Sequence, residues 1–373
     1  MRYNVNQYDK SPCAGLRTAS AEGDCPPTCT GLGLAGNACP VMLGSSLLRD
    51  GETIVPLVDF GFNPTIVHAP AYLLRHGIAY VGTDRFEKNN NRVVCRNPSL
   101  RSYVRNNAST ARLLLLNAKM RVLKRMPIYG DRCVAYRYSA VDARLFVIGS
   151  ELHASYVNMW GDSTCRGHFL ARINLQLNSS QPAAFVSPQR LRSVRNGGIL
   201  VHGKRVTTEL SDVAPITEMV NMHTGAVSTS YPPLQFSTFM HNSMHPIWVP
   251  ELAAFLGIGH RHLREGYDAN GRVVHNAPFQ YGSSYRHVFF TLNATTRRIN
   301  RFSREFCIAA LDHSYACEGI SFIMGAFLRN SKTNTISFTY GINDCESALL
   351  TLSMARLHAL LEFDPLHAIA KII

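Results

Sequence analysis

Ile336-Ser-Phe-Thr-Tyr-Gly-Ile-Asn-Asp-Cys-Glu346 is the stretch of this sequence that says most about its fold. Its first five residues alternate between apolar and polar side chains, which is the periodicity of a β-strand. The strand is predicted to stop at Gly341, and a helix is predicted to follow from Ser347. Asp344 and Glu346 would lie at the junction, where carboxylates either bind the hydroxyl groups of a ligand or cap the helix. The apolar face of the predicted helix carries Leu350, Met354, Leu357 and Leu361.

The composition is that of a packed globular protein. Of the 373 residues, 46% are hydrophobic and only 17% are charged, which excludes a disordered chain. The length allows one large all-β domain or two ordinary domains. The longest apolar runs, such as residues 113–116, are too short to cross a bilayer, and the polar first ten residues do not form a signal peptide. No association with a membrane is evident.

The net charge of +13 favours anionic partners such as phosphate, sugar nucleotides, nucleic acid or an anionic membrane. None of the basic clusters forms a nucleic-acid motif, and none interleaves aromatic residues as RNA-binding proteins do. We interpret them as solvated faces and expect no nucleic-acid partner. The alternative, a binder of nucleic acid or anionic surfaces, predicts a steep salt dependence. The clusters comprise residues 119–125, 190–195 and 297–304.

Four of the ten cysteines crowd the first 40 residues. The spacing of Cys25 and Cys29 lacks the second pair that a structural zinc site needs, so disulfides fit these cysteines as well as a metal does. Glycosylation sequons occur at Asn107, Asn178 and Asn293. Together these features lean toward the secretory pathway or the Golgi lumen, with a cytoplasmic location left open.

Strand signals recur after an irregular, Cys-, Gly- and Pro-rich arm at residues 1–45. Residues 73–81 and 144–156 are predicted to form hairpins, and helix is predicted in the C-terminal segment and at residues 109–120. Many short strands with Gly and Pro between them indicate a sandwich, barrel or propeller. Five units of about 64 residues would be longer than common propeller repeats. Further strands are predicted at residues 168–177, 255–264, 287–292, 321–328 and 335–340.

Asp142 and Arg144 are the first candidates for chemistry. They have the same parity, so on an extended strand they project to the same face. An Asp beside an Arg is held ionised, yet it can act as a general acid if substrate or burial raises its pKa. The alternative is a structural ion pair at the start of a strand.

A second group of candidates is basic. His260 and His262 share one strand face, but a metal site would need a third ligand, and none stands at a recognisable spacing. With Lys204, Arg286 and His287 they could bind a phosphate or another oxyanion. The alternative is scattered surface basicity. No nucleophile elbow, P-loop or HExxH motif is present.

Taken in order, six motifs resemble the five-bladed β-propeller glycosidases and phosphorylases, nearest the β-mannoside phosphorylases and related mannosyltransferases. The resemblance spans residues 45–363. It implies an all-β fold, a five-bladed β-propeller over residues 46–373 with a C-terminal helix packed outside or below it. The motifs are Phe62-Asn63-Pro64, Val141-Asp-Ala-Arg144, residues 256–262, residues 285–290, residues 303–306 and residues 339–344.

The resemblance also implies roles for individual residues. The segment around Asp142 usually reads Glu-Asp-Pro-Arg in that family, and its Asp is the proton donor; here Val141 and Ala143 replace the Glu and the Pro. The family's Lys-Asn-Trp segment, which helps to hold phosphate, is not recognisable, and Lys204 is a loose substitute. Binding of the sugar is implied for Asn63, Arg85, Tyr340 and Asp344.

The balance of charges indicates the reaction. An inverting hydrolase needs two carboxylates about 6.5–9.5 Å apart, whereas a phosphorylase or a transferase needs one acid and a cationic cluster. One candidate acid among many cations favours phosphorolysis or transfer; Glu305, Glu318 and Glu346 would be the bases in a hydrolase. We expect an inverting carbohydrate-active enzyme, with a sugar phosphate or sugar nucleotide as donor and no metal or cofactor. The alternative is a glycan-binding propeller without activity.

Overall fold

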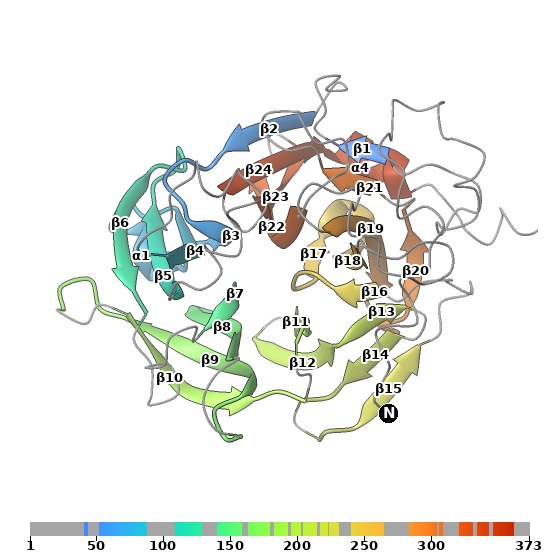
Figure 1. Cartoon of the computed structure of the whole chain (residues 1–373), viewed down its shortest axis with the longest axis horizontal. Helices are drawn as coiled ribbons and strands as arrows, with labels where there is room; N and C mark the ends of the chain where they lie inside the picture. Colours follow the sequence, from blue (N-terminus) through green and yellow to red (C-terminus); the bar gives the residue numbers. More distant parts are fainter. Residues whose placement is uncertain are drawn as a thin grey trace, which may run out of the picture.

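The strands of the described chain form five sheets arranged as blades around a centre (Figure 1). The computed structural model describes residues 41–43, 52–87, 109–128, 140–158, 163–179, 183–230, 240–264, 283–308, 321–330 and 334–361, with short gaps at 193–194, 203, 215–216, 223, 304–305 and 343–345. The predicted five-bladed β-propeller is confirmed. Of the predicted N-terminal arm, only β1 (Val41–Leu43) is described, and it pairs in parallel with β21 (Phe306–Ile308) of the fourth blade.

The first three blades are antiparallel four-stranded sheets that follow one another along the chain. Blade one contains β3 (Phe62–His68), β4 (Tyr80–Glu87), β5 (Ser109–Leu116) and β6 (Val122–Pro127). Blade two contains β7 (Val141–Ile148), β8 (Glu151–Asn158), β9 (Gly167–Leu175) and β10 (Ala183–Arg190). Blade three contains β11 (Gly198–His202), β12 (Arg205–Leu210), β14 (Thr217–Val220) and β15 (Val227–Ser230).

Blade four is an eight-stranded sheet built on the long pair of β18 (Ala254–Arg264) and β19 (Ser283–Asn293). β16 (Met240–Asn242) and β17 (Ile247–Val249) pair with β18, and β20 (Ile299–Phe302) pairs with β19. β13 (Asp212–Ala214) extends the sheet from β16. A 3-10 turn, η4 (Pro250–Leu252), leads into β18.

Blade five joins the two ends of the described propeller. Its strands β22 (Ser321–Asn330), β23 (Thr335–Ile342) and β24 (Glu346–Ser353) come from the C-terminal part, and the fourth, β2 (Glu52–Pro56), comes from the N-terminal part. The C-terminal helix α4 (Met354–Leu361) follows β24 and packs its apolar side chains into a core cluster with residues of blades four and five. The ring is thus closed by non-covalent pairing of β2 with β24.

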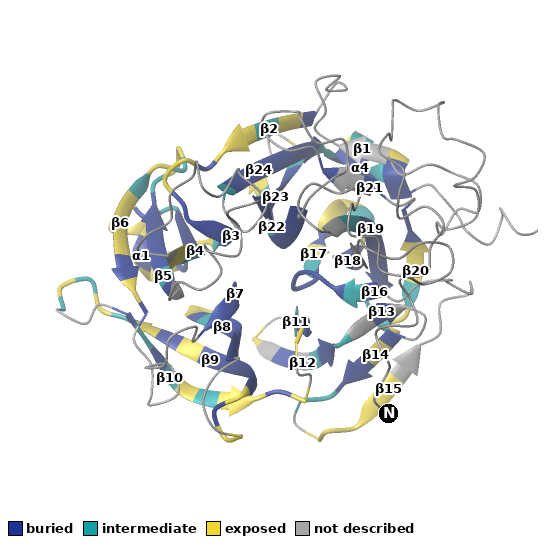
Figure 2. Ribbon diagram, in the orientation of Figure 1, coloured by how far each residue is buried: buried dark blue, intermediate teal, exposed yellow. Residues whose placement is uncertain are grey.

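Burial follows the radius of the ring (Figure 2). The middle strands are apolar on both faces because each blade is covered by its two neighbours, whereas the outer strands β2, β6 and β20 are largely exposed. Figure 1 places β3, β7, β11, β17 and β22 nearest the centre. The ends of these inner strands are therefore where residues from different blades meet.

Three local predictions need correction. Residues 109–120 are not helical, because they contain strand β5. The segment from Ser347 is strand β24, so the helix begins only at Met354, and Gly341 lies inside β23 rather than at its end. Both strands are buried on two faces, and a continuous apolar run does not distinguish such a strand from a helix.

Most predicted strands are confirmed, but one predicted hairpin is wrong. The hairpin at residues 144–156 is β7 and β8, and the predicted strands starting at residues 168, 255, 287, 321 and 335 match β9, β18, β19, β22 and β23. Residues 73–81 are not a hairpin: the short helix α1 (Ala71–Leu74) leads into β4, which pairs with β3.

Closure of the ring should depend on Glu52. Its Oε1 accepts a hydrogen bond from Nε of Arg356 at 2.7 Å, and both side chains are largely buried between β2 and α4. Glu52→Ala leaves the guanidinium without this partner, so we expect the free energy of unfolding to fall by about 3 kcal/mol. Urea denaturation measures it. Glu151→Ala, which breaks the exposed pair with Arg172, is the matched control and should change little; equal losses would contradict the prediction.

Two features bear on the compartment. Cys165 is buried and disulfide-bonded, and structural disulfides are typical of oxidising compartments. Asn178 of one sequon is exposed in the turn between β9 and β10. In the described part of the chain, no helix is long and apolar enough to span a membrane.

Candidate functional site

The inner strands of blades one and two begin with the same unusual backbone. Asn63 and Asp142 are each the second residue of their strand, and both have positive φ, 52° and 54°. In each strand the register shifts at this point, so a bulge replaces regular pairing. Asn and Asp tolerate this conformation better than other non-glycine residues. The two bulges bring these side chains together: Asn63 Nδ2 donates to Asp142 Oδ1 at 3.4 Å.

Asp142 is a buried carboxylate surrounded by guanidinium groups. Only 6% of the residue is exposed, and Oδ2 lies 3.4 Å from Nη2 of Arg195. Burial raises the pKa of Asp142, but the charges of Arg195, Arg85 and Arg144 outweigh it and hold the pKa below its ordinary value. Asp142 is therefore ionised at neutral pH. Because its backbone is not extended, its place beside Arg144 follows from the bulge and not from the predicted parity.

Arg144 is two residues after Asp142 in strand β7. It is 2% exposed, and its Nη1 donates to the carbonyl oxygen of Gly197, at the entry of blade three, at 2.9 Å. Burial lowers its pKa to about 10, so it stays charged at neutral pH. Its Nε has no hydrogen-bond partner among the described residues, and the same holds for Oδ1 of Asn63. Unsatisfied buried polar atoms are rare, and two in one cluster indicate a place for a ligand.

Arg195 is the site residue that the sequence analysis missed. It stands just before β11, its side chain is 55% exposed, and it pairs with Asp142. Asn196 follows it with a φ of 61°, so a left-handed residue also stands at the entry of β11. The available signal was the basic cluster at residues 190–195, which we interpreted as a solvated face.

His260 lies in a cage of polar and aromatic groups near these residues. Its Nδ1 is 2.8 Å from Ser243 Oγ, its ring stacks on Tyr285 and meets Phe322 edge-on. Burial lowers the pKa of His260 well below its ordinary value, and the charges of neighbouring groups including Arg144 lower it further. His260 is thus neutral at neutral pH and offers hydrogen bonds rather than charge.

The other basic candidates are more dispersed. His287 is fully buried and stacked on Phe306, and burial lowers its pKa to about 3, so it is neutral. Arg286 is half-buried in β19. Lys204 is exposed and lies beside Gly149. Gly149 follows the last residue of β7, whereas Asp142 is near the start of that strand. The structure does not bring Lys204 to Asp142.

Of the remaining sugar-binding candidates, the structure describes Arg85 and Tyr340. Arg85 lies opposite Phe62 in the β3–β4 ladder, with its guanidinium 4.9 Å from that ring. Tyr340 is fully buried in the core, and burial raises the pKa of its hydroxyl. Gly341 is required next to it because a side chain there would overlap Oδ1 of Asn63. Asp344 and the side chain of His262 lie outside the described residues, as do Glu305 and Glu318.

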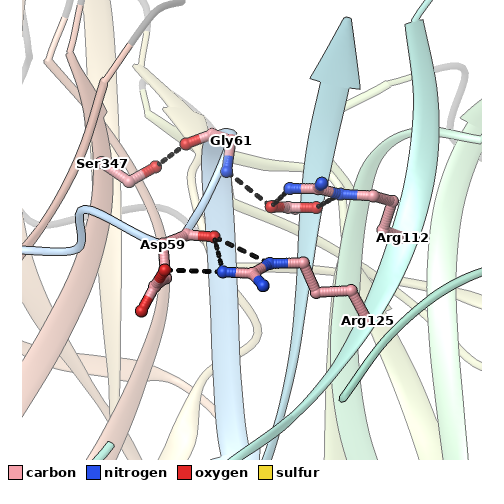
Figure 3. A network of polar contacts seen from close by, with 6 residues as sticks. Asp59, Gly61, Arg112, Arg125 and Ser347 are labelled. Atoms are coloured by element: carbon pink, nitrogen blue, oxygen red, sulfur yellow. Dashed lines mark hydrogen bonds and ion pairs between the residues drawn. The ribbon is translucent and has the colours of Figure 1, made fainter. Parts of the chain in front are cut away.

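A polar network fixes the chain just before Asn63 (Figure 3). The amide of Gly61 donates to Oδ2 of Asp84 at 2.5 Å, and the guanidinium of Arg112 donates hydrogen bonds to both carboxylate oxygens of Asp84. From blade five, the hydroxyl of Ser347 donates to the carbonyl oxygen of Gly61. Asn63 is thus held by blades one and five while it contacts blade two.

A Ser–His pair nearby does not have the form of a nucleophile and its base. Ser155 Oγ lies 3.1 Å from Nε2 of His245. The amide of Ile199 donates to Nδ1 at 2.8 Å, so the neutral ring carries its proton on Nε2 and cannot accept one from Ser155. Burial also lowers the pKa of His245 well below its ordinary value. No metal-binding group of His, Cys, Asp or Glu occurs among the described residues.

Comparisons with known proteins agree with this architecture. The chain is similar to a β-1,2-mannobiose phosphorylase from Listeria innocua, with 11% identity, a TM-score of 0.51, and coverage of 85% of this chain and 94% of that one. It is also similar to MPT-1, a GDP-Man-dependent mannosyltransferase from Leishmania mexicana, with 12% identity, a TM-score of 0.48, and coverage of 81% of this chain and 89% of that one. A third similar structure is MPT-4, a mannose phosphorylase from the same organism, with 12% identity, a TM-score of 0.45, and coverage of 84% of this chain and 86% of that one. No protein-family model and no curated protein sequence matches the chain. At 11% identity the likeness to the Listeria protein establishes the fold alone.

Proposed function

We propose that this protein is a carbohydrate-active enzyme, a glycoside phosphorylase or glycosyltransferase, that moves a glycosyl unit between a hydroxyl oxygen and an anionic phosphate oxygen. The observation that carries the proposal is the buried carboxylate of Asp142, which is held among the guanidinium groups of Arg85, Arg144 and Arg195. One carboxylate can move one proton, and the surplus positive charge suits a phosphate group. The sugar is proposed to be β-mannosyl, from the motif resemblance and the activity named for the Listeria protein of the same fold.

In the direction of phosphorolysis, a phosphate oxygen attacks the anomeric carbon from the face opposite the glycosidic bond. The bond between that carbon and the glycosidic oxygen breaks, and Asp142 gives its proton to the leaving oxygen. A single displacement of this kind inverts the anomeric configuration. In the reverse direction the sugar phosphate is the donor, and the Asp142 carboxylate takes the proton of the acceptor hydroxyl. Asn63 would accept a hydrogen bond from a sugar hydroxyl through Oδ1.

The arginines also couple anion binding to the protonation of Asp142. Without a ligand they keep the carboxyl ionised, which is the state that transfer to an acceptor hydroxyl requires. A phosphate bound to Arg144 and Arg195 would cancel much of their field and raise the pKa of Asp142 toward the protonated state that phosphorolysis requires. Water brings no charge, so it could not produce this change. A charged site of this kind therefore suits phosphorolysis or transfer better than hydrolysis.

The proposal is tested by phosphate-dependent turnover. The protein is incubated with β-mannosides and β-glucosides, with and without inorganic phosphate, and sugar 1-phosphate is measured; sugar nucleotides with acceptor sugars form a second arm. We expect sugar 1-phosphate only with phosphate, or transfer from an activated donor. Arg195→Ala should raise the KM for phosphate about tenfold or more, and Arg172→Ala, in an exposed ion pair on blade two, should not.

Two outcomes would overturn the proposal. Free sugar formed equally with and without phosphate would identify a hydrolase and would require a second carboxylate. Binding of glycans without any product, from mannosides and from sugar nucleotides alike, would identify a propeller that only binds.

A further inference from the structure

We propose that Thr65 and Thr83, buried in blade one, are positioning residues that hold the Asp142–Arg144 segment of blade two in its active geometry. The inference rests on the proposed function for the meaning of "active", but the geometry is independent of it. Neither threonine is more than 1% exposed, so neither can touch a substrate directly. Their effect on chemistry has to pass through β7.

The bulge in β7 leaves backbone groups that its own blade does not pair. Val141 is opposite Val157 and Arg144 is opposite Ser155, so Asp142 and Ala143 together face a single residue of β8. A bulge of this kind interrupts the ladder and bends the strand. Buried backbone groups at such a break need other partners.

Blade one supplies those partners. The hydroxyl of Thr83 donates to the carbonyl oxygen of Ala143 at 2.9 Å, and Thr65 Oγ1 lies 3.3 Å from the same oxygen. The amide of Leu145 donates to Thr65 Oγ1 at 3.3 Å. The two hydroxyls are 2.7 Å apart and belong to residues that face each other in the β3–β4 ladder.

These contacts form one continuous chain of hydrogen bonds. It runs from the amide of Leu145 to Thr65, from Thr65 to Thr83, and from Thr83 to the carbonyl oxygen of Ala143. This series of hydrogen bonds therefore starts at Leu145, the residue after Arg144, and ends at Ala143, the residue after Asp142. Arg144 lies within the short segment that is fixed in this way, and Asp142 is the residue directly before it. Because the clamp comes from a different blade, it also sets the distance between Asn63 of blade one and Asp142.

Space for the clamp is provided by blade five. A side chain at Gly325 of β22 would come to 3.4 Å from Cβ of Thr65 and 3.1 Å from the hydroxyl of Thr339. The glycine lets β22 approach the threonine pair closely. The pair is thus enclosed by blades one, two and five, which restricts the rotamers of both hydroxyl groups.

The test uses Thr83→Val, which keeps the shape and removes the hydroxyl, and Thr83→Ser, which keeps the hydroxyl. Thr351→Val is the matched control, because Thr351 and Ser337 form the same kind of buried hydroxyl pair, at 2.8 Å, across β23 and β24. Two readouts are taken: the titration of the Asp142 carboxyl by NMR with labelled aspartate, assigned with Asp142→Asn, and the kcat of sugar 1-phosphate formation.

We expect Thr83→Val to move the titration of Asp142 upward, as its carboxylate moves relative to the guanidinium groups, and to lower kcat by about tenfold to a hundredfold with little change in KM. Thr83→Ser should restore both. If Thr83→Val titrates like Thr351→Val, the positioning role is refuted, whatever the activity. If the wild-type protein has no turnover but the titration moves as expected, the proposed function fails and the clamp on Asp142 stands.

Discussion

Asp142→Asn should lower the rate of phosphorolysis or glycosyl transfer by about 10²–10⁴-fold, because it removes the group that exchanges a proton with the glycosidic oxygen. The amide is nearly the same size and can still accept the hydrogen bond from Asn63 Nδ2. The KM for the sugar should therefore change much less than kcat. Steady-state kinetics on the best substrate of the panel measures both constants.

A substrate whose leaving group needs no proton makes this test specific for the role of Asp142 as an acid. A 2,4-dinitrophenyl glycoside departs without needing a proton, so Asp142→Asn should be far less impaired on it than on a disaccharide. A loss of equal size on both substrates would contradict the role as acid and would indicate that Asp142 only shapes the site. Asp59→Asn is a suitable control, since Asp59 is an exposed aspartate paired with Arg125 on the surface and should keep full activity.

The sequence indicated Asp142, Arg144 and Asn63, but not the reason they belong together. Equal parity places Asp142 and Arg144 on one face only in an extended strand, whereas Asp142 has a φ of 54° in a bulge. The bulge recurs at Asn63 with different residues around it. What repeats between blades is a backbone conformation, and such a repeat leaves no literal repeat in the sequence.

Arg195 was missed for a related reason. It precedes β11, a five-residue inner strand whose apolar pattern is too short to predict from the sequence. Only the fold brings it to Asp142, which lies 53 positions earlier in the chain. Conversely, residue type alone predicts that His260 and His287 are cations, whereas burial makes them neutral. Charge at a site depends on solvation, which the sequence does not specify.

Buried neutral histidines lead to the second large expected effect, a steep loss of stability in mild acid. Burial lowers the pKa of His287 to about 3 and moves those of His245 and His260 well below their ordinary value. In the unfolded chain a histidine has a pKa of about 6.5. Between these values unfolding takes up protons, so the contribution of these residues to stability is present above pH 6.5 and is lost as the pH falls.

The size of the effect follows from the number of protons. Each histidine that is neutral when folded and protonated when unfolded adds a slope of about 1.4 kcal/mol per pH unit, so three of them add about 4 kcal/mol per unit below pH 6. A domain with a total stability of about 5 kcal/mol, the lower end of the usual range, would then unfold near pH 5, above the pKa values of ordinary carboxylates. Urea denaturation at pH 7.5, 6.5 and 5.5 measures the slope.

His287→Phe isolates one of these protons. His287 stacks on Phe306 with ring centroids 5.5 Å apart, so a phenylalanine can occupy the same place without a titrating group. The variant should lose about one third of the slope and be more stable than the wild type at pH 5.5. Thr351→Val lowers stability without removing a titrating group, so its slope should equal that of the wild type. A slope unchanged in His287→Phe would mean that His287 is protonated in the folded protein, and that the basic strand β19 carries charge toward the site after all.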